Sequence, residues 1–232
     1  MPADPRAYLA DLVKTLKLRW PENRIVNVCC HGHSVPSGYF WTPLVDPFNS
    51  YPYLLHVGLK ERFHWAVINV IVTAIGGEGS TTGAQRFEKD VLSHRPDVVT
   101  IDYGLNDRGT AKEQVLDNLT SMISMAKAAR CRVILLTPTW DIREMDGTLD
   151  GSWIAPLREQ AQLIRDLADK HEVGLADSFA EFERYVRSGG DPVDLMSGVN
   201  HPNRRGHELV ATALLRYFAI RTYEDYDANW VK

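Results

Sequence analysis

The sequence predicts an α/β fold: a three-layer α/β/α sandwich around a central parallel sheet of about five strands. Two observations lead to this prediction. Short apolar runs recur along the chain without the alternation of a half-exposed sheet, so both of their faces are expected to be buried. Amphipathic stretches lie between these runs, and parallel neighbours need helical crossovers of that kind.

The expected strands are short and rich in β-branched residues. They are Ile25 to Cys30, Ala66 to Thr73, Val98 to Tyr103, Arg132 to Thr137 and Val173 to Ala176. The expected helices are an opening helix through Leu16 that starts at Asp4 and Pro5, then Tyr53 to Arg62, Ala84 to Leu92, a helix ending at Ala129 behind a Thr110–Glu113 capping box, Ile154 to Lys170, and Arg204 to Ile220. One domain over residues 1–232 is expected.

Composition excludes several classes of protein. The net charge of −4 arises from 26 basic and 30 acidic residues without a basic run, so nucleic acid is not an expected partner. Cys29 and Cys30 lie side by side in an apolar run and are expected to be buried thiols. With neither a signal-peptide pattern nor a run of membrane-spanning length, we expect a cytoplasmic protein without membrane insertion.

Polar and glycine-rich segments follow the strands where a parallel sheet binds its ligands, beyond the carboxyl ends. These segments are His31 to Gly38, Gly76 to Thr82 and Tyr103 to Asp107, joined by Asn200 to Asn203 near the C-terminus. Acyl transfer needs a nucleophile, a base and donors aimed at an oxyanion, and the four segments can supply all three. The loops Pro36 to Pro52 and Asp141 to Trp153 are expected to wall a pocket.

The order and spacing of these segments resemble the blocks of the SGNH hydrolases, also called GDSL esterases and lipases. Gly32, His33 and Ser34 match the first block, Gly77 with Glu78 the second, Gly104 to Asp107 the third, and His201 with Pro202 the last. The resemblance implies a flavodoxin-like sheet and an esterase without a metal or cofactor. It assigns Ser34 as nucleophile, His201 as base, and Ser34, Gly77 and Asn106 as oxyanion donors.

The sequence departs from this family's pattern at two positions. Gly198 stands three residues before His201, where the family has an orienting aspartate. We therefore expect a Ser34–His201 dyad whose histidine is held by a backbone carbonyl near Ser197 or Gly198, with Asp194 or Asp191 as the competing orienter. His33 replaces the aspartate of the first block. Because the side chains of neighbours in a turn usually diverge, His33 need not touch the Ser34 hydroxyl, and it is expected to pack or hydrogen-bond locally.

Other polar residues near the blocks have structural interpretations. His31 and His33 lack a third ligand, so no metal site is expected. Asp107 is expected to brace loops, and His207 to cap or pack. For Glu78, contact with substrate and capping of the following helix both remain open.

The expected substrate is a small-molecule or carbohydrate ester with a short acyl group such as acetyl. A lysophospholipase or thioesterase of the same fold is the alternative enzyme, and an inactive relative that binds a glycan or protein is the alternative from another class. Tyr223, Tyr226 and Trp230 are candidates for an arm that docks on the body or on a second subunit, which would make a homo-oligomer.

Overall fold

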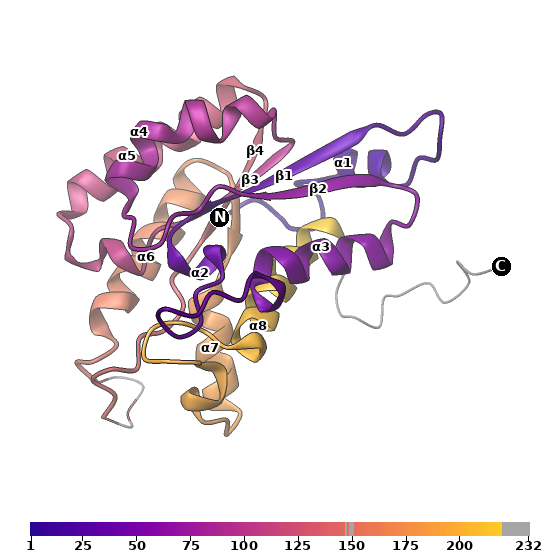
Figure 1. The fold of residues 1–232 in the computed structure, drawn as a ribbon. Coiled ribbons are helices and arrows are strands. Elements are labelled where there is room, and N and C mark those ends of the chain that lie inside the picture. Colours follow the sequence, from indigo (N-terminus) through magenta and orange to yellow (C-terminus); the bar gives the residue numbers. More distant parts are fainter. Residues whose placement is uncertain (147, 149–150, 220–232) are drawn as a thin grey trace.

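The structure, a computed structural model, describes residues 1–146, 148 and 151–219 and is built on one five-stranded parallel sheet (Figure 1). The strand order is β2-β1-β3-β4-β5, the flavodoxin-like order, so the predicted fold class is confirmed. The strands are β1 Ile25–Gly32, β2 Val67–Val72, β3 Val98–Asp102, β4 Arg132–Leu136 and β5 Gly174–Ala176.

Helices cover both faces of this sheet. They are α1 Ala10–Leu16, α2 Ser34–Ser37, α3 Tyr51–Arg62, α4 Ser80–Asp90, α5 Lys112–Ala128, α6 Ala155–Lys170, α7 Ser178–Arg187 and α8 Arg204–Leu215. Single 3-10 turns, η1 to η5, occupy Pro47–Asn49, Leu92–His94, Asn106–Gly109, Pro192–Leu195 and Arg216–Phe218. Within the described ranges, no helix has the length and apolar character needed to cross a membrane.

Two hydrophobic clusters lie on opposite faces of the sheet. One joins α1, α3, α7 and α8 to the side chains of β1 that include Val28 and Cys30. The other joins α4, α5 and most of α6 to the face that includes Cys29. Since neighbouring side chains of a strand point to opposite faces, adjacent cysteines enter different clusters. Burial raises the pKa of each of these two thiols to about 12, as expected for buried thiols.

The structure differs from the sequence-based expectations at several helix ends. Thr110 follows η3 and its side chain caps nothing, so the predicted capping box is wrong; the helix begins at Lys112. Helix α7, which Asp177 caps through the amide of Ala180, was not predicted. Helix α8 ends at Leu215, and Tyr223, Tyr226 and Trp230 lie outside the described residues.

Two buried histidines stabilise contacts between elements. His207 of α8 is fully buried, and its Nδ1 accepts the amide hydrogen of Tyr51, 3.1 Å away, at the start of α3. His31 of β1 is also fully buried. Burial, together with the charge of Arg86 at His31 and of His201 at His207, lowers the pKa of His31 to about 4 and that of His207 to about 3. Both rings are therefore neutral in the folded protein near neutral pH.

We predict that stability falls as the pH drops from 6.5 toward 4. The unfolded histidines bind protons below 6.5 while the folded ones do not, so unfolding is favoured by about 1.4 kcal/mol per pH unit for each ring. His207→Asn keeps an acceptor for the Tyr51 amide but cannot titrate, so its free energy of unfolding should fall less steeply. The exposed His94→Asn serves as control, and urea unfolding at several pH values measures all three proteins. A variant slope equal to that of the wild type would contradict this account.

Candidate active site

The candidate site lies at the carboxyl end of the sheet, where β1 pairs with β2 on one side and β3 on the other. The connections that follow β1 and β3 run in opposite directions along the sheet. At such a point a crevice forms beyond the carboxyl ends of the strands. Gly32 ends β1 and pairs with Asp102, the last residue of β3. The chain then turns at once into α2, with Ser34 as its first residue and Gly38, at φ 87°, as its end.

Ser34 meets His201 in this crevice. The Nε2 atom of His201 lies 2.9 Å from Oγ of Ser34, across a sequence separation of 167 residues. Both residues are largely buried, and the ring of Tyr39 stacks on the imidazole at a centroid distance of 6.1 Å. The Ser197 hydroxyl donates to the carbonyl oxygen of Phe40, 2.6 Å away, and so ties the loop before His201 to the loop after Ser34. The hydroxyl and the imidazole thus form the pair that proton transfer requires.

The protonation state of His201 is set by burial and two neighbouring charges. Burial lowers the pKa of its imidazole, charge on His33 lowers the same pKa further, and the Asp141 carboxylate raises it. The net effect is a pKa below the ordinary 6.5, so the ring is neutral at pH 7 and able to accept a proton. The loop that carries Asp141 is joined to the loop that carries His201 by a 2.7 Å hydrogen bond from the Ile142 amide to the Val199 carbonyl oxygen.

The groups expected to orient His201 have other partners. Asp191 accepts the amide hydrogen of Val193, and Asp194 accepts the hydroxyl of Tyr185 at 2.8 Å. Over residues 1–146, 148 and 151–219, Nδ1 of His201 makes no hydrogen bond, either to these carboxylates or to a carbonyl near Ser197. Asp141, which sequence reasoning placed only in a pocket wall, is the carboxylate whose charge acts on the ring.

The expected oxyanion donors lie on three separate turns. The amide of Ser34 opens a helix and so has no intrahelical acceptor. Gly77 adopts φ 79°, which favours glycine, and the space where a side chain would stand is open. The side-chain amide of Asn106 donates one hydrogen to the carbonyl oxygen of Glu78, 2.9 Å away, which fixes its orientation and leaves its second hydrogen for another acceptor.

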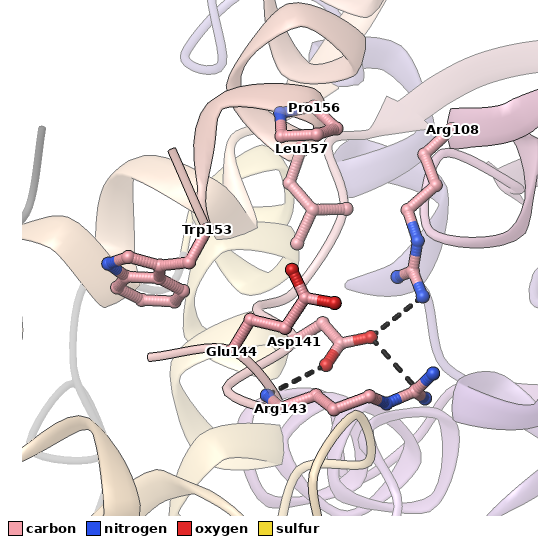
Figure 2. A pocket seen from close by; sticks show the side chains of 7 residues that line it. All are labelled: Arg108, Asp141, Arg143, Glu144, Trp153, Pro156 and Leu157. Atoms are coloured by element: carbon pink, nitrogen blue, oxygen red, sulfur yellow. Dashed lines mark hydrogen bonds and ion pairs between the residues drawn. The ribbon is translucent and has the colours of Figure 1, made fainter. Parts of the chain in front are cut away.

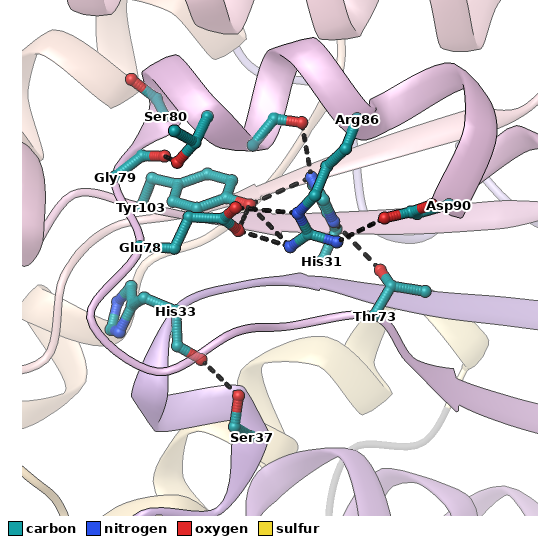
Figure 3. Close-up of polar contacts among 12 residues, drawn as sticks. His31, His33, Ser37, Thr73, Glu78, Gly79, Ser80, Arg86, Asp90 and Tyr103 are labelled. Carbon is teal, nitrogen blue, oxygen red and sulfur yellow. Dashed lines mark hydrogen bonds and ion pairs between the residues drawn. The ribbon is translucent and has the colours of Figure 1, made fainter.

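A buried polar network holds the loop of Gly77 and Glu78 in place (Figure 3). Arg86 of α4 binds both carboxylate oxygens of Glu78, with 2.8 Å between Nε and Oε1. The hydroxyl of Tyr103 donates to the same carboxylate at 2.8 Å and lies 3.0 Å from Nε2 of His31. Burial raises the pKa of Glu78, but the donors from Arg86 and Tyr103 outweigh it and leave that pKa lowered. The Glu78 carboxylate therefore does not cap a helix and is not free to bind substrate, because Arg86 and Tyr103 already donate hydrogen bonds to it.

Asp107 and His33, which lie beside the expected site residues, make structural contacts. Asp107 accepts the amide hydrogen of Ser80 at 2.9 Å and so braces the start of α4, as expected. Burial raises its pKa, which the bonds from Ser80 and charge on His33 partly offset. His33 accepts the amide hydrogen of Val35 at 3.2 Å, the expected local bond. Its Nδ1 also lies 3.5 Å from Oγ of Ser34, a contact that the sequence did not predict.

A pocket of about 270 Å³ is lined by Asp141, the carboxylate whose charge acts on His201 (Figure 2). In its wall the Asp141 carboxylate forms ion pairs with Arg108 at 2.8 Å and with Arg143 at 3.7 Å. Trp153 and Leu157 supply apolar walls, so the loop from Asp141 to Trp153 borders a pocket as expected. The loop from Pro36 to Pro52 lines a second cavity of about 190 Å³. Among the described residues, the pockets included, no three His, Cys, Asp or Glu side chains form a group that could hold a metal ion.

Comparison with known proteins agrees with these blocks. Residues 30–209 match the GDSL-like lipase/acylhydrolase family. The chain belongs to that family. An arylesterase from Vibrio mimicus is 33% identical over 107 residues, which is 45% of this chain and only 50% of that relative's own length. An acetylxylan esterase from Geobacillus stearothermophilus is 25% identical over 177 residues, covering 69% of this chain and 77% of the relative. The predicted SGNH resemblance is thereby confirmed.

Solved structures share the fold of this GDSL-like chain. A structure of an acetylxylan esterase from Geobacillus stearothermophilus superposes with a TM-score of 0.74 at 20% identity, covering 88% of this chain and 97% of the other. An α/β hydrolase from the metagenome of Lake Arreo gives 0.73 at 22% identity, covering 85% and 96%. At these identities the likeness extends to the fold alone.

We predict that Arg86→Met lowers the free energy of unfolding by about 3 kcal/mol, because it leaves the buried Glu78 carboxylate without its cation. Arg204→Met, which breaks an exposed ion pair with Glu208, is the matched control and should cost about 0.5 kcal/mol or less. Urea unfolding curves give both values. Equal losses for the two variants would show that the network does not stabilise the loop.

Proposed function

We propose that this protein is a serine esterase in which Ser34 is the nucleophile and His201 its base. The observation that carries the proposal is the 2.9 Å contact between the Ser34 hydroxyl and a buried imidazole with a lowered pKa. A neutral imidazole at this distance can take the hydroxyl proton as the oxygen attacks an acyl carbon. Membership of the acylhydrolase family supports the same chemistry.

The reaction takes two steps, and in each step His201 takes one proton and then gives it up. Ser34 Oγ attacks the ester carbonyl while His201 takes its proton, and the bond to the alcohol then breaks as His201 gives that proton to the departing oxygen. Water repeats the sequence on the acyl-enzyme and releases the acid and the free hydroxyl. The Ser34 and Gly77 amides and the free hydrogen of the Asn106 amide stabilise the oxyanion, each contributing about 10² to 10³ in rate.

The substrate we propose is a short-chain acyl ester, such as an acetyl ester, on a carbohydrate or small alcohol. Asp141, whose charge acts on His201, also lines the pocket of about 270 Å³, and a pocket of this size supports a small substrate. Its charged wall of Arg108, Asp141 and Arg143 suits a polar alcohol better than a long lipid chain. A relative described as an acetylxylan esterase agrees with this choice.

Labelling with a fluorophosphonate tests the proposal directly. We expect the wild type to be labelled and to hydrolyse an acetate ester, and Ser34→Ala to do neither because it lacks the nucleophile. The intact-protein mass identifies the adduct. Ser37→Ala, three residues away in the same short helix, is the matched control and should still label. Background labelling of both wild type and Ser34→Ala would instead favour a binding protein without esterase activity.

The pH profile follows from the state of His201. Because a protonated imidazole cannot accept the serine proton, kcat/KM should be level above pH 6.5 and fall as the pH drops through the lowered pKa. Asp141→Asn removes the charge that raises this pKa, so the midpoint of the fall should move to lower pH. Asp194→Asn, whose carboxylate binds Tyr185, is the control and should leave the midpoint in place. A midpoint that moves with Asp194 and not with Asp141 would reverse the assignment.

A further inference from the structure

A second imidazole, that of His33, lies near the Ser34 hydroxyl in addition to that of His201. His33 is 1% exposed, and its Nδ1 lies 3.5 Å from Oγ of Ser34, against 2.9 Å for Nε2 of His201. The family pattern has an aspartate at this position, so the contact is a property of this chain and not of the shared blocks.

A buried carboxylate lies behind that imidazole. Oδ1 of Asp102 is 3.4 Å from Nε2 of His33, and the two side chains are 5% and 1% exposed. The atoms are within ion-pair distance but form no hydrogen bond here, and Nε2 has no other partner among the described residues. Gly32 makes the approach possible, since a Cβ there would lie 2.4 Å from the carbonyl oxygen of Asp102. The end of β3 thus brings a negative charge beneath the nucleophile turn.

The hydrogen bonds of His33 define its tautomer. Nδ1 accepts the amide hydrogen of Val35 at 3.2 Å, so this nitrogen carries a lone pair and the proton of the neutral ring is on Nε2. Carboxylate, imidazole and hydroxyl therefore follow one another as Asp102, His33 and Ser34. A ring that gained a proton on Nδ1 would have the carboxylate 3.4 Å from its other nitrogen, in a site where water does not screen the attraction.

We propose that His33, with Asp102 behind it, is a second general base for Ser34. This inference rests on the esterase function proposed above. In this route the Ser34 proton passes to Nδ1 of His33 as Oγ bonds to the acyl carbon. The same proton then leaves with the alcohol oxygen when the ester bond breaks, and no proton passes to Asp102.

His201 remains the main base while it is present. It is closer to Oγ, and the lone pair of His33 is shared with the Val35 amide. Charge on His33 also lowers the pKa of His201, so a proton on one imidazole disfavours a proton on the other. The route through His33 carries most of the reaction only when His201 is gone and the serine hydroxyl is free to rotate toward Nδ1.

The experiment is a double-mutant cycle on the rate of fluorophosphonate labelling at Ser34. Its variants are His201→Ala, His33→Asn and the two together, with Ser34→Ala as background. The asparagine side-chain oxygen replaces Nδ1 as acceptor for the Val35 amide, so α2 keeps its cap. We expect His201→Ala to slow labelling by about 10² to 10⁴ yet leave it above background. His33→Asn should then slow it at least about tenfold further, a larger factor than in the presence of His201.

Asp102→Asn in the His201→Ala background is the second variant and should also slow labelling, because the charge that balances protonated His33 is gone. If His33→Asn acts by the same factor in both backgrounds, it merely supports the turn and the proposal is overturned. The proposal also fails if His201→Ala labels no faster than background. Failure of the esterase function itself would be seen separately, as a wild type that does not label at Ser34.

Discussion

The pairing of β1 with β3 determines where every other part of the site can stand. Because the strands are parallel and Gly32 lies opposite Asp102, the segments that follow both strands emerge at one edge of the sheet. A glycine at this point lets the backbones approach closely, and Ser34 is two residues beyond it. Helix α8, which begins three residues after His201, packs on α3 and so brings His201 to the same edge. The contact between Ser34 and His201 is therefore a consequence of sheet register and helix packing together.

Polar groups under the site are arranged so that few charges are left unbalanced. Glu78 is matched by Arg86, Asp141 by Arg108, and His31 stays neutral between Thr73 and Tyr103. Buried charges cost free energy unless they are paired and hydrogen-bonded. The hydrogen bond from the Asn106 amide to the Glu78 carbonyl oxygen joins the turn after β3 to the turn after β2 and fixes the Gly77 turn and the Asn106 amide relative to each other. A catalytic oxyanion site requires such an arrangement before the substrate arrives.

The sequence predicted the strands well because burial on both faces leaves a simple apolar pattern. All five runs became strands, with ends shifted by one or two residues. Helix α7 was missed although Phe179 and Phe182 have helical spacing after Asp177, because only a short segment separates β5 from the next loop. The contacts of Asp102 with His33, and of Glu78 with Arg86, depend on register and helix rotation. No local pattern reports those quantities, so the chain alone could not reveal them.

The missing aspartate before His201 changes what the surrounding charges must do. A carboxylate bonded to Nδ1 would both orient the ring and stabilise its protonated form. Here Tyr39 stacks on the ring and the Ser197 hydroxyl anchors its loop, so orientation comes from packing. Stabilisation of positive charge comes from Asp141, whose field is weakened by its bond to Arg108. Orientation and charge are thus supplied by different residues, and a weaker field at His201 makes a second carboxylate-backed imidazole beside Ser34 more useful than it would be in a complete triad.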